Sequence, residues 1–213
     1  MAERHSMTND TTQLLEMLAS RICHDLISPV GAIHNGIEFL EEMGPEAMED
    51  GLELMKHSAL QSTVKLKAFR LAYGAGGRDP SVKPEDVYNA IDDYVKLDGK
   101  IKQDWDPHGE ITDIELDGFS KILMGTMLLA TEILVKGGTL KVEASNNSAK
   151  IHASGDGFLL RESIMHALSG ETGVEDIDPR SVTAYLLGLN AKDLGLNVTI
   201  DPSDEHITFI ISR

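Results

Sequence analysis

The sequence predicts an α + α/β fold with two parts: an N-terminal antiparallel helical hairpin over residues 8–74 and a C-terminal α/β sandwich over 84–213. Apolar residues recur in steps of three and four through the first part, which is the period of one helix face. Residues 74–80 are rich in Gly, end in Pro and have no period, so we predict a linker over 75–83. Beyond it, strand-like segments are grouped with helical ones, which is typical of a sheet covered by helices on one face.

The first predicted helix covers residues 7–43. Pro29 removes one backbone donor from its interior and should bend it. Gly44 and Pro45 should end it, since Gly favours a helix C-terminus and Pro favours the first turn of the next helix. The apolar face of this helix consists of Leu15, Leu18, Ile22, Leu26, Val30, Ile33, Ile37 and Leu40.

The second predicted helix covers residues 45–73. Its apolar positions, with Ser62 among them, match the first helix in period and length, so the two should form an antiparallel hairpin. Two helices enclose little core by themselves. Pairing two hairpins into a four-helix bundle buries both apolar faces, and we therefore predict a homodimer. The apolar positions of the second helix are Met48, Leu52, Met55, Ala59, Leu66, Phe69 and Tyr73.

The C-terminal part should form a sheet and several helices. Asp117 is expected to cap the apolar helix that follows it, and Asp178 is expected to cap the last helix. Asn146 and Asn147 suggest a tight turn between two strands. The predicted helices cover 84–95, 117–135, 160–168 and 179–192, and the predicted strands cover 101–105, 111–116, 139–144, 149–153, 197–200 and 207–211.

The composition excludes several classes of function. A formal net charge of -16 disfavours nucleic acid and anionic membrane surfaces as partners, because both attract clusters of Lys and Arg. The single Cys23 rules out an internal disulfide framework and multi-cysteine zinc sites, and it suits a reducing compartment. No apolar run reaches the roughly 18–20 residues that span a bilayer, and residues 1–10 lack the apolar segment of a signal peptide. We therefore expect a cytoplasmic protein.

The candidate for chemistry is His24. At about 100° per residue, its side chain points roughly 175° away from the mean direction of the apolar face. Ser28, Gly31 and Asn35 lie on the same outward strip, and Asp25 follows His24 directly. An exposed neutral imidazole can carry a phosphoryl group when a carboxylate accepts a hydrogen bond from its other ring nitrogen. The helix pattern alone fits an ordinary surface histidine as well, so both interpretations stay open at this point.

The residues around His24 resemble a known family. The dipeptide His24-Asp25, followed by Ser28-Pro29, resembles the H-box of two-component histidine kinases, in which a His is followed by an acid and, five residues on, by Pro. The longer segment 21–33, with Asn35-Gly36 and Glu38 beyond it, more specifically resembles the ChpT-type histidine phosphotransferases of alphaproteobacteria. The architecture that this resemblance implies covers nearly the whole chain.

The resemblance implies a cytoplasmic homodimer with a kinase-like helical bundle and a C-terminal domain like the ATP-binding domain of histidine kinases, but degenerate and unable to bind ATP. It implies that His24 takes a phosphoryl group from one receiver-domain aspartate and passes it to another, while Asp25 orients or polarises the ring. The implied partners are receiver domains of response regulators and of a hybrid histidine kinase. Any Mg²⁺ is expected on the receiver, and no cofactor on this chain.

The sequence itself bears on whether an ATP site survives. A kinase of this kind needs an Asn-bearing helix that holds Mg²⁺, an Asp-x-Gly-x-Gly turn for adenine and a Gly-rich lid over the phosphates. The helix expected to carry the Asn, 122–132, has none. We interpret the Gly-rich segment 154–158 as a turn, and the leucines of 186–189 and 194–196 as core. We therefore predict a phosphotransferase; the alternatives are a histidine kinase with a divergent nucleotide site and a non-catalytic dimeric scaffold.

A receiver domain should dock beside His24. The residues expected to contact it are Arg21, Ile27, Ser28, Gly31 and Asn35. Gly31 would permit close approach, and Arg21 could pair with an acidic group of the partner or with the phosphoryl group; its spacing fits a solvated charge equally well. Lys65, Lys67 and Arg70 either contact the acidic pocket of a receiver or balance the acidic surface.

Other kinds of chemistry are disfavoured. His24-Asp25 is also the name-giving pair of metal-dependent phosphohydrolases, but His34 lies roughly 80° away around the helix, and we expect no metal site. Cys23 and His24 are adjacent in a helix and diverge, so they should not form a nucleophile–base pair. We interpret Cys23 as a half-buried packing residue and Trp105 as a packing aromatic.

Overall fold

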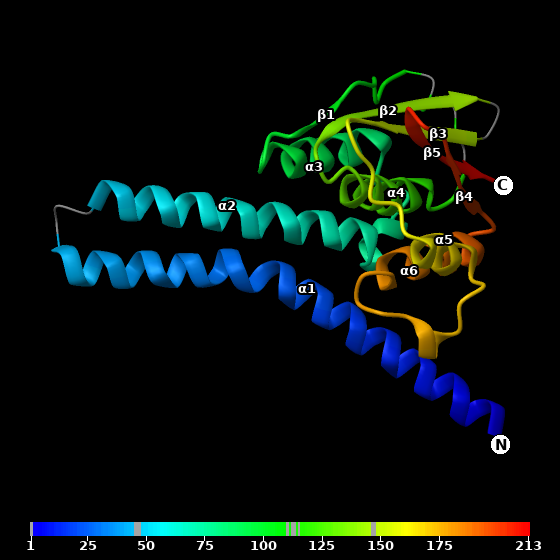
Figure 1. Cartoon of the computed structure of the whole chain (residues 1–213), viewed down its shortest axis with the longest axis horizontal. Helices are drawn as coiled ribbons and strands as arrows, with labels where there is room; N and C mark the ends of the chain where they lie inside the picture. Colours follow the sequence, from blue (N-terminus) through cyan, green and yellow to red (C-terminus); the bar gives the residue numbers. More distant parts are fainter. Residues whose placement is uncertain (1, 45–47, 110, 112–113, 115, 146–147) are drawn as a thin grey trace.

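Two long helices form the N-terminal part of the protein in a computed structural model that describes residues 2–44, 48–109, 111, 114, 116–145 and 148–213. Helix α1 (Ala2–Met43) and helix α2 (Met48–Ala72) run antiparallel as the predicted hairpin (Figure 1). α1 begins earlier than the predicted position 7. Residues 45–47, the predicted start of the second helix, lie outside the described residues.

Glycines allow the two helices to approach closely. A Cβ atom added at Gly36 would lie 2.7 Å from Cγ of Met55, and one added at Gly51 would lie 2.6 Å from Cδ2 of Leu40. Side chains at these two positions would push the helices apart, because such separations are well below van der Waals contact. The small residues therefore define the line along which α1 and α2 pack.

The N-terminal half of α1 leaves the hairpin and packs against the C-terminal part of the chain. Figure 1 shows α1 turning away from α2 toward its N-terminus, and Pro29, which favours such a bend, lies inside the helix. Leu14, Met17 and Ile22 contact the main hydrophobic core. Of these three, only Ile22 belongs to the predicted apolar face, and Leu15 of that face is 62% exposed. The N-terminal half of α1 therefore packs through a partly different face from the one that the spacing predicted.

The C-terminal part contains one five-stranded sheet in the order β1-β2-β3-β5-β4. β1 and β2 are parallel, and all other neighbours are antiparallel. The elements are α3 (Pro84–Lys96), β1 (Ile101–Gln103), α4 (Phe119–Ile133), β2 (Gly138–Ser145), β3 (Ser148–Ser154), α5 (Glu162–Ser169), α6 (Val182–Asp193), β4 (Asn197–Pro202) and β5 (His206–Ser212), with short 3₁₀ helices at Ala75–Arg78 and Val174–Asp176.

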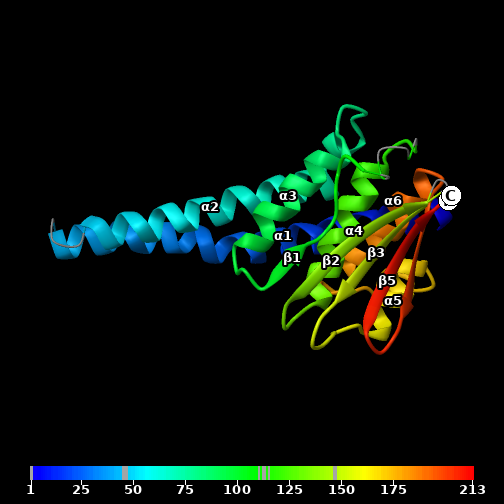
Figure 2. The same ribbon diagram turned by 90° about the horizontal axis from the view of Figure 1, so that it is seen from above.

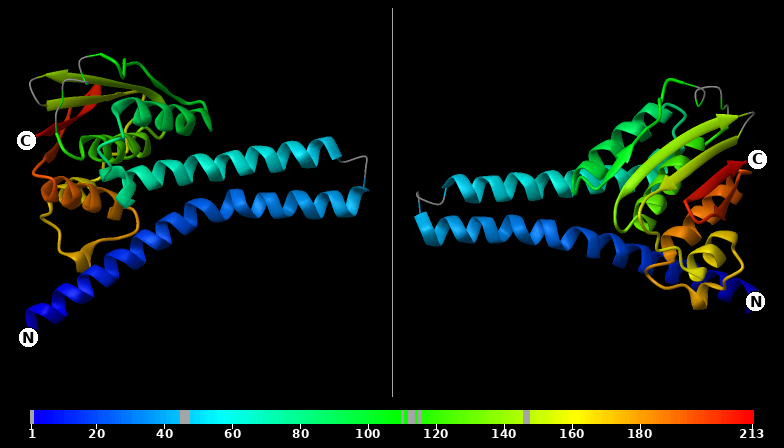
Figure 3. Two further views of the ribbon diagram at one scale, coloured as in Figure 1. Left: turned by 180° about the vertical axis from the view of Figure 1, so that it is seen from behind. Right: turned by 45° about the horizontal axis from the view of Figure 1, so that its top comes forward.

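The sheet, a layer of helices and the hairpin are stacked in that order. Figures 2 and 3 show the helices of the C-terminal part on one face of the sheet, with the hairpin extending beyond them. Alternate residues of β3, such as Ile151, and most of β5, such as Phe209, are buried beneath these helices. α4 is the central helix, since almost all of its side chains are buried. This arrangement holds the C-terminal end of α4 against the hairpin.

Four local predictions need correction. Ile111, Ile114 and Leu116 do not form a strand; they pack irregularly against the core, and the remainder of 111–116 lies outside the described residues. β1 ends at Gln103, short of the predicted 105. Asp117 does not cap α4, because Gly118, with φ of 72°, occupies the N-cap position in the left-handed conformation.

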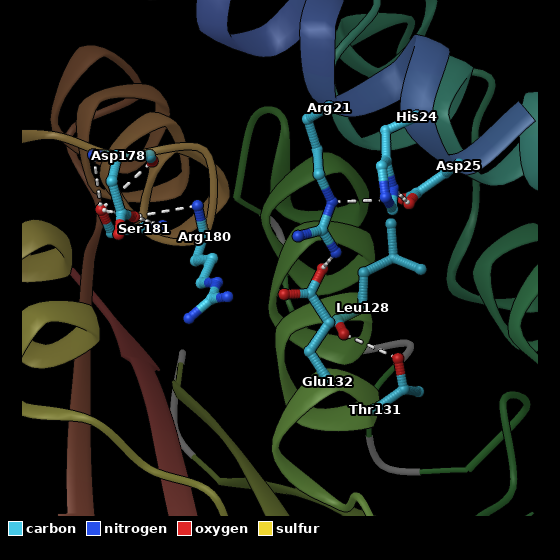
Figure 4. Close-up of polar contacts among 9 residues, drawn as sticks. All are labelled: Arg21, His24, Asp25, Leu128, Thr131, Glu132, Asp178, Arg180 and Ser181. Atoms are coloured by element: carbon cyan, nitrogen blue, oxygen red, sulfur yellow. Dashed lines mark hydrogen bonds and ion pairs between the residues drawn. The ribbon is translucent and has the colours of Figure 1, made fainter. Parts of the chain in front are cut away.

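The fourth correction concerns the start of α6. The helix begins at Val182 with Ser181 at its N-cap, later than predicted. The Asp178 carboxylate instead closes the turn before the helix, where it accepts hydrogen bonds from the backbone N–H groups of Arg180 and Ser181 at 2.9 and 2.8 Å (Figure 4). Partial burial raises the pKa of the Asp178 carboxyl group. These two bonds and one from the Ser181 hydroxyl lower it by more, so the pKa lies below its ordinary value.

The predicted fold class is confirmed: a helical N-terminal region is followed by a mixed sheet with helices on one face. The predicted domain boundaries and the pairing of two hairpins into a four-helix bundle stay predictions. In the part of the chain that the structure describes, no helix combines the length and apolar character needed to cross a membrane.

Candidate functional site

His24 projects from α1 into solvent. Its side chain is 83% exposed, while Ile22 and Leu26 on the opposite side of the helix are half-buried. This is the orientation that the spacing of apolar residues predicts, because positions two residues before and after a given residue lie on the opposite face of a helix. The imidazole is therefore accessible to a macromolecular partner.

Asp25 sets the tautomer of the His24 ring. Oδ1 of Asp25 lies 3.1 Å from Nδ1 of His24 (Figure 4). A carboxylate accepts hydrogen bonds but has no proton to donate, so this contact requires the proton of the neutral ring to be on Nδ1. Nε2 then carries the lone pair. The pair thus presents an exposed nitrogen nucleophile to solvent.

Arg21 links Asp25 to the C-terminal part of the chain. Its Nε donates to Oδ2 of Asp25 at 3.2 Å, and its Nη2 donates to Oε1 of Glu132, near the end of α4, at 3.0 Å (Figure 4). Arg21, Asp25 and Glu132 are each about three-quarters buried. Burial by itself would lower the pKa of the Arg21 guanidinium, but Glu132 and Asp25 more than offset it and the pKa is raised. Arg21, predicted to face a partner, is thus held by ion pairs within the chain.

Lys65 of α2 completes the surroundings of this network. Its Nζ donates to the backbone carbonyl oxygen of Asp25 at 3.0 Å, which fixes α2 to α1 one residue beyond His24. A cleft of about 330 Å³ opens beside it between the hairpin and the C-terminal part, and its lining includes Lys65, Tyr94, Asp98, Thr131 and Glu132. To contact a receiver as predicted, Lys65 would have to give up its hydrogen bond to the Asp25 carbonyl oxygen.

The other predicted docking residues lie near His24 on the surface of α1. Ile27 is 72% exposed, and Ser28 and Asn35 are exposed. Gly31 is half-buried, and a Cβ atom added there would meet no atom within 4 Å. The structure therefore gives Gly31 no packing role within this chain. The roles of these four residues in docking stay predictions.

Glu132 was not among the predicted site residues. It lies 111 positions beyond Arg21 in the sequence, so no local spacing connects the two. The available signal was a carboxylate within an apolar segment: α4 is buried along most of its length, and Glu132 occupies its last turn. A charged residue there needs a partner from another element.

The remaining candidates are partly corrected. Cys23, interpreted as half-buried, is exposed on α1. Trp105 packs edge-on against Tyr88 with a centroid distance of 5.1 Å, and its Nε1 donates to Gln103. His34 Nε2 lies 3.3 Å from Oε1 of Glu38. Among the described residues, no group of three His, Cys, Asp or Glu side chains is placed to hold a metal ion.

Comparison with known proteins reveals relatives of the whole chain. Residues 84–206 match the family model described as histidine phosphotransferase C-terminal domain. Protein phosphotransferase ChpT of Brucella abortus (strain 2308) is 32% identical over 214 residues, which cover 95% of this chain and 97% of that protein. A solved structure of a bacterial phosphotransferase superposes with a TM-score of 0.75 at 30% identity, and the match covers 93% of this chain and 95% of the other. The chain therefore belongs to the histidine phosphotransferase family and is a phosphotransferase of a phosphorelay.

Proposed function

We propose that His24 is the phosphoryl carrier of this phosphotransferase and that it exchanges the group with aspartates of receiver domains. The observation that carries the proposal is the contact of Asp25 Oδ1 with Nδ1 of an imidazole that is 83% exposed. That contact leaves Nε2 unprotonated and directed at solvent, where a partner can present a phosphorylated aspartate.

The proposed transfer needs no group from outside the two proteins. The Nε2 lone pair attacks the phosphorus atom in line with the acyl-phosphate oxygen; an N–P bond forms, the O–P bond breaks, and the receiver aspartate leaves as a carboxylate. The proton on Nδ1 stays on the ring, and Asp25 stabilises the positive charge that develops there. The second receiver reverses these steps. Any Mg²⁺ belongs to the acidic pocket of the receiver.

We propose that the transfer is independent of ATP, and the packing of three segments supports this. A Cβ atom at Gly155 would lie 2.4 Å from the carbonyl oxygen of Gly137, and one at Gly188 would lie 2.2 Å from that of Leu168. Both glycines therefore permit close backbone packing, which accounts for them without a nucleotide. Leu187 is buried. α4, which covers the segment expected to carry the Asn of a kinase, has only buried or half-buried side chains.

We further propose that two copies pair through the hairpins into a four-helix bundle. Val30 and Ile37 on α1 are one heptad apart and about half exposed. On α2, Met48, Leu52 and Leu66 are exposed; the first two are four residues apart, and Leu66 lies two heptads beyond Leu52. Heptad-spaced apolar residues on the open side of both helices are typical of a helical bundle interface. A dimer of this kind covers them with the same face of a second copy.

The proposed partners are receiver domains of response regulators and of a hybrid histidine kinase, in the cytoplasm. They would dock along α1 over Ile27, Ser28, Gly31 and Asn35, which follow His24 along the helix. This strip combines an exposed aliphatic side chain, small polar groups and a glycine at which an added Cβ atom would meet no atom within 4 Å. An apolar centre with a polar rim is the usual composition of such interfaces.

The test is transfer of label from a phosphorylated receiver domain. The wild type, His24→Ala and His34→Ala are each mixed with the receiver without ATP, and acid-labile label on this chain is measured. His34 is the matched control, since it is 72% exposed on the same helix. We expect label on the wild type and on His34→Ala but not on His24→Ala. Label on His24→Ala, or label that appears from ATP with no receiver present, would contradict the proposal.

A further inference from the structure

A chain of four polar side chains connects the exposed imidazole to the C-terminal part of the molecule. It runs from His24 to Asp25, then to Arg21, and ends at Glu132, with successive distances of 3.1, 3.2 and 3.0 Å. Figure 4 shows the three members from α1 lying above α4, with the Glu132 carboxylate directed at the Arg21 guanidinium. His24 is the one exposed member, so the other three lie behind it.

The geometry divides the oxygens of Asp25 between two partners. Oδ1 faces His24 and Oδ2 faces Arg21. A carboxylate that is free to rotate would present either oxygen in any direction, whereas an ion pair on Oδ2 fixes the plane of the group. The guanidinium is itself planar and donates in fixed directions, so its own orientation decides where Asp25 is held.

Glu132 is placed to fix that orientation. It binds Nη2 of Arg21, while Nε of the same guanidinium binds Asp25. Arg21 has a long, flexible side chain, and without Glu132 its guanidinium would lose one of its two ion pairs and keep more rotamers. Glu132 is carried by α4, whose other side chains are almost all buried, so its backbone is held firmly by the core.

The surroundings of Glu132 strengthen the contact. Two tyrosines face it: burial and then the Glu132 carboxylate raise the pKa of Tyr94 to about 12, and the same causes raise that of Tyr73. Burial also raises the pKa of Glu132 more than Arg21 lowers it. Water is thus largely replaced by protein around the Arg21–Glu132 pair, and a charge-assisted hydrogen bond is stronger in such an environment.

We propose that Glu132 is a positioning residue for phosphotransfer: through Arg21 it holds Asp25 in the orientation that keeps the His24 proton on Nδ1 and leaves Nε2 free to react. The C-terminal part of the chain, which carries Glu132, thereby acts on the reacting imidazole without touching the phosphoryl group. This inference rests on the proposed function of His24, and it assigns a role to a residue that the motif around His24 does not contain.

The experiment compares the full-length wild type with Glu132→Gln, Glu132→Asp, Asp25→Asn and the control Glu143→Gln. Glu143 is a matched control, since Oε2 of its carboxylate lies 3.6 Å from Nε2 of His152, remote from His24. Two readouts are used: the rate of label transfer from a phosphorylated receiver at increasing receiver concentration, and the tautomer of the His24 ring from two-bond ¹H–¹⁵N NMR spectra.

We expect the wild type to hold the Nδ1–H tautomer, and Glu132→Gln to shift His24 toward Nε2–H, the form that a histidine without a partner prefers in water. Its kcat for transfer should fall by about ten- to a hundredfold, since a misplacement of about 1 Å can cost roughly a hundredfold, while KM for the receiver changes little. Asp25→Asn should show both effects more strongly, Glu132→Asp should restore part of the rate, and Glu143→Gln should match the wild type.

Two results would overturn the inference. Glu132→Gln could transfer at the wild-type rate, or it could lose rate while His24 keeps the wild-type tautomer, in which case Glu132 would act on folding or docking. Failure of the proposed function is distinguishable from both: label on His24→Ala would reject His24 as carrier, yet the tautomer of His24 in the unphosphorylated protein would still report on Glu132.

Discussion

Arg21 and Glu132 are 111 positions apart in the sequence, and their side chains meet at 3.0 Å. The pair joins α1, which carries the phosphoryl-accepting His24 of our proposal, to α4, the central helix of the C-terminal part. Because Arg21 also binds Asp25 at 3.2 Å, the contact connects the packing of the two parts to the geometry around His24. It therefore offers places where stability and transfer can be tested separately.

Arg21→Gln should destabilise the protein. The substitution leaves the half-buried carboxylates of Asp25 and Glu132 near each other without a cation between them, which costs on the order of 1–3 kcal/mol of unfolding free energy. Urea unfolding at neutral pH measures this. The control is Arg70→Gln, since Arg70 is an exposed cation on α2 and its loss should change stability by less than about 0.5 kcal/mol. Equal stability of the two variants would mean that the network contributes nothing.

The pH dependence of stability should report on Glu132. Burial raises the pKa of its carboxyl group above the ordinary 4.5, in spite of Arg21. Between the ordinary and the raised pKa, the folded state holds a proton that the unfolded chain has released, so the contribution of this group to stability falls as the pH rises through that window. The difference in unfolding free energy between wild type and Glu132→Gln, measured from pH 4 upward, should therefore move in favour of the variant. If the difference instead moves in favour of the wild type, the pKa of Glu132 is lowered by folding and not raised.

Much of the fold could be predicted because it depends on local patterns. The period of apolar residues predicts the hairpin, and the same pattern predicts the outward position of His24, since a helix converts spacing directly into direction. The local details failed where one residue overrode a general preference. Gly118 took the N-cap position expected for Asp117 by adopting a positive φ. In the N-terminal half of α1, Leu14 and Met17 contact the core, whereas Leu15 of the predicted apolar face is exposed.

The candidate site could be predicted only as far as it lies within one helix. His24 and Asp25 are neighbours in the chain, and Arg21 lies one turn away, so the sequence pattern places all three. Glu132 and Lys65 come from other helices, and their contacts with Arg21 and with the Asp25 backbone depend on how α2 and α4 pack. For this reason Arg21 was expected to face a partner, whereas the structure pairs it within the chain.

Gly31→Phe should weaken docking of the receiver without harming the fold. A Cβ atom added at Gly31 would meet no atom of another segment within 4 Å, and any residue other than Pro is favoured over Gly inside a helix by a few tenths to about 1 kcal/mol. The unfolding free energy should thus stay equal or rise. On the proposed docking surface, however, a phenyl ring would stand between the helix and the receiver.

The expected result for Gly31→Phe is a KM for the phosphorylated receiver at least tenfold higher, with acid-labile label still placed on His24. Glu41→Phe adds the same ring to an exposed position at the far end of α1 and should leave KM unchanged. If both variants transfer label like the wild type, the receiver does not approach α1 over Gly31.

Leu52→Glu and Ile37→Glu should convert the proposed dimer into a folded monomer. In a single chain Ile37 is 45% and Leu52 39% exposed, so a carboxylate there meets water in the monomer. In a four-helix bundle it would be buried without a partner, at a cost of several kcal/mol per copy. Light scattering coupled to size-exclusion chromatography gives the mass, which should fall from that of two chains to the 23.2 kDa of one. Leu189→Glu is the control, because Leu189 is equally exposed but lies on α6, away from the hairpin. A wild type that already runs as a monomer would contradict the proposed dimer. A dimer that persists in both hairpin variants would mean that the chains associate through another surface.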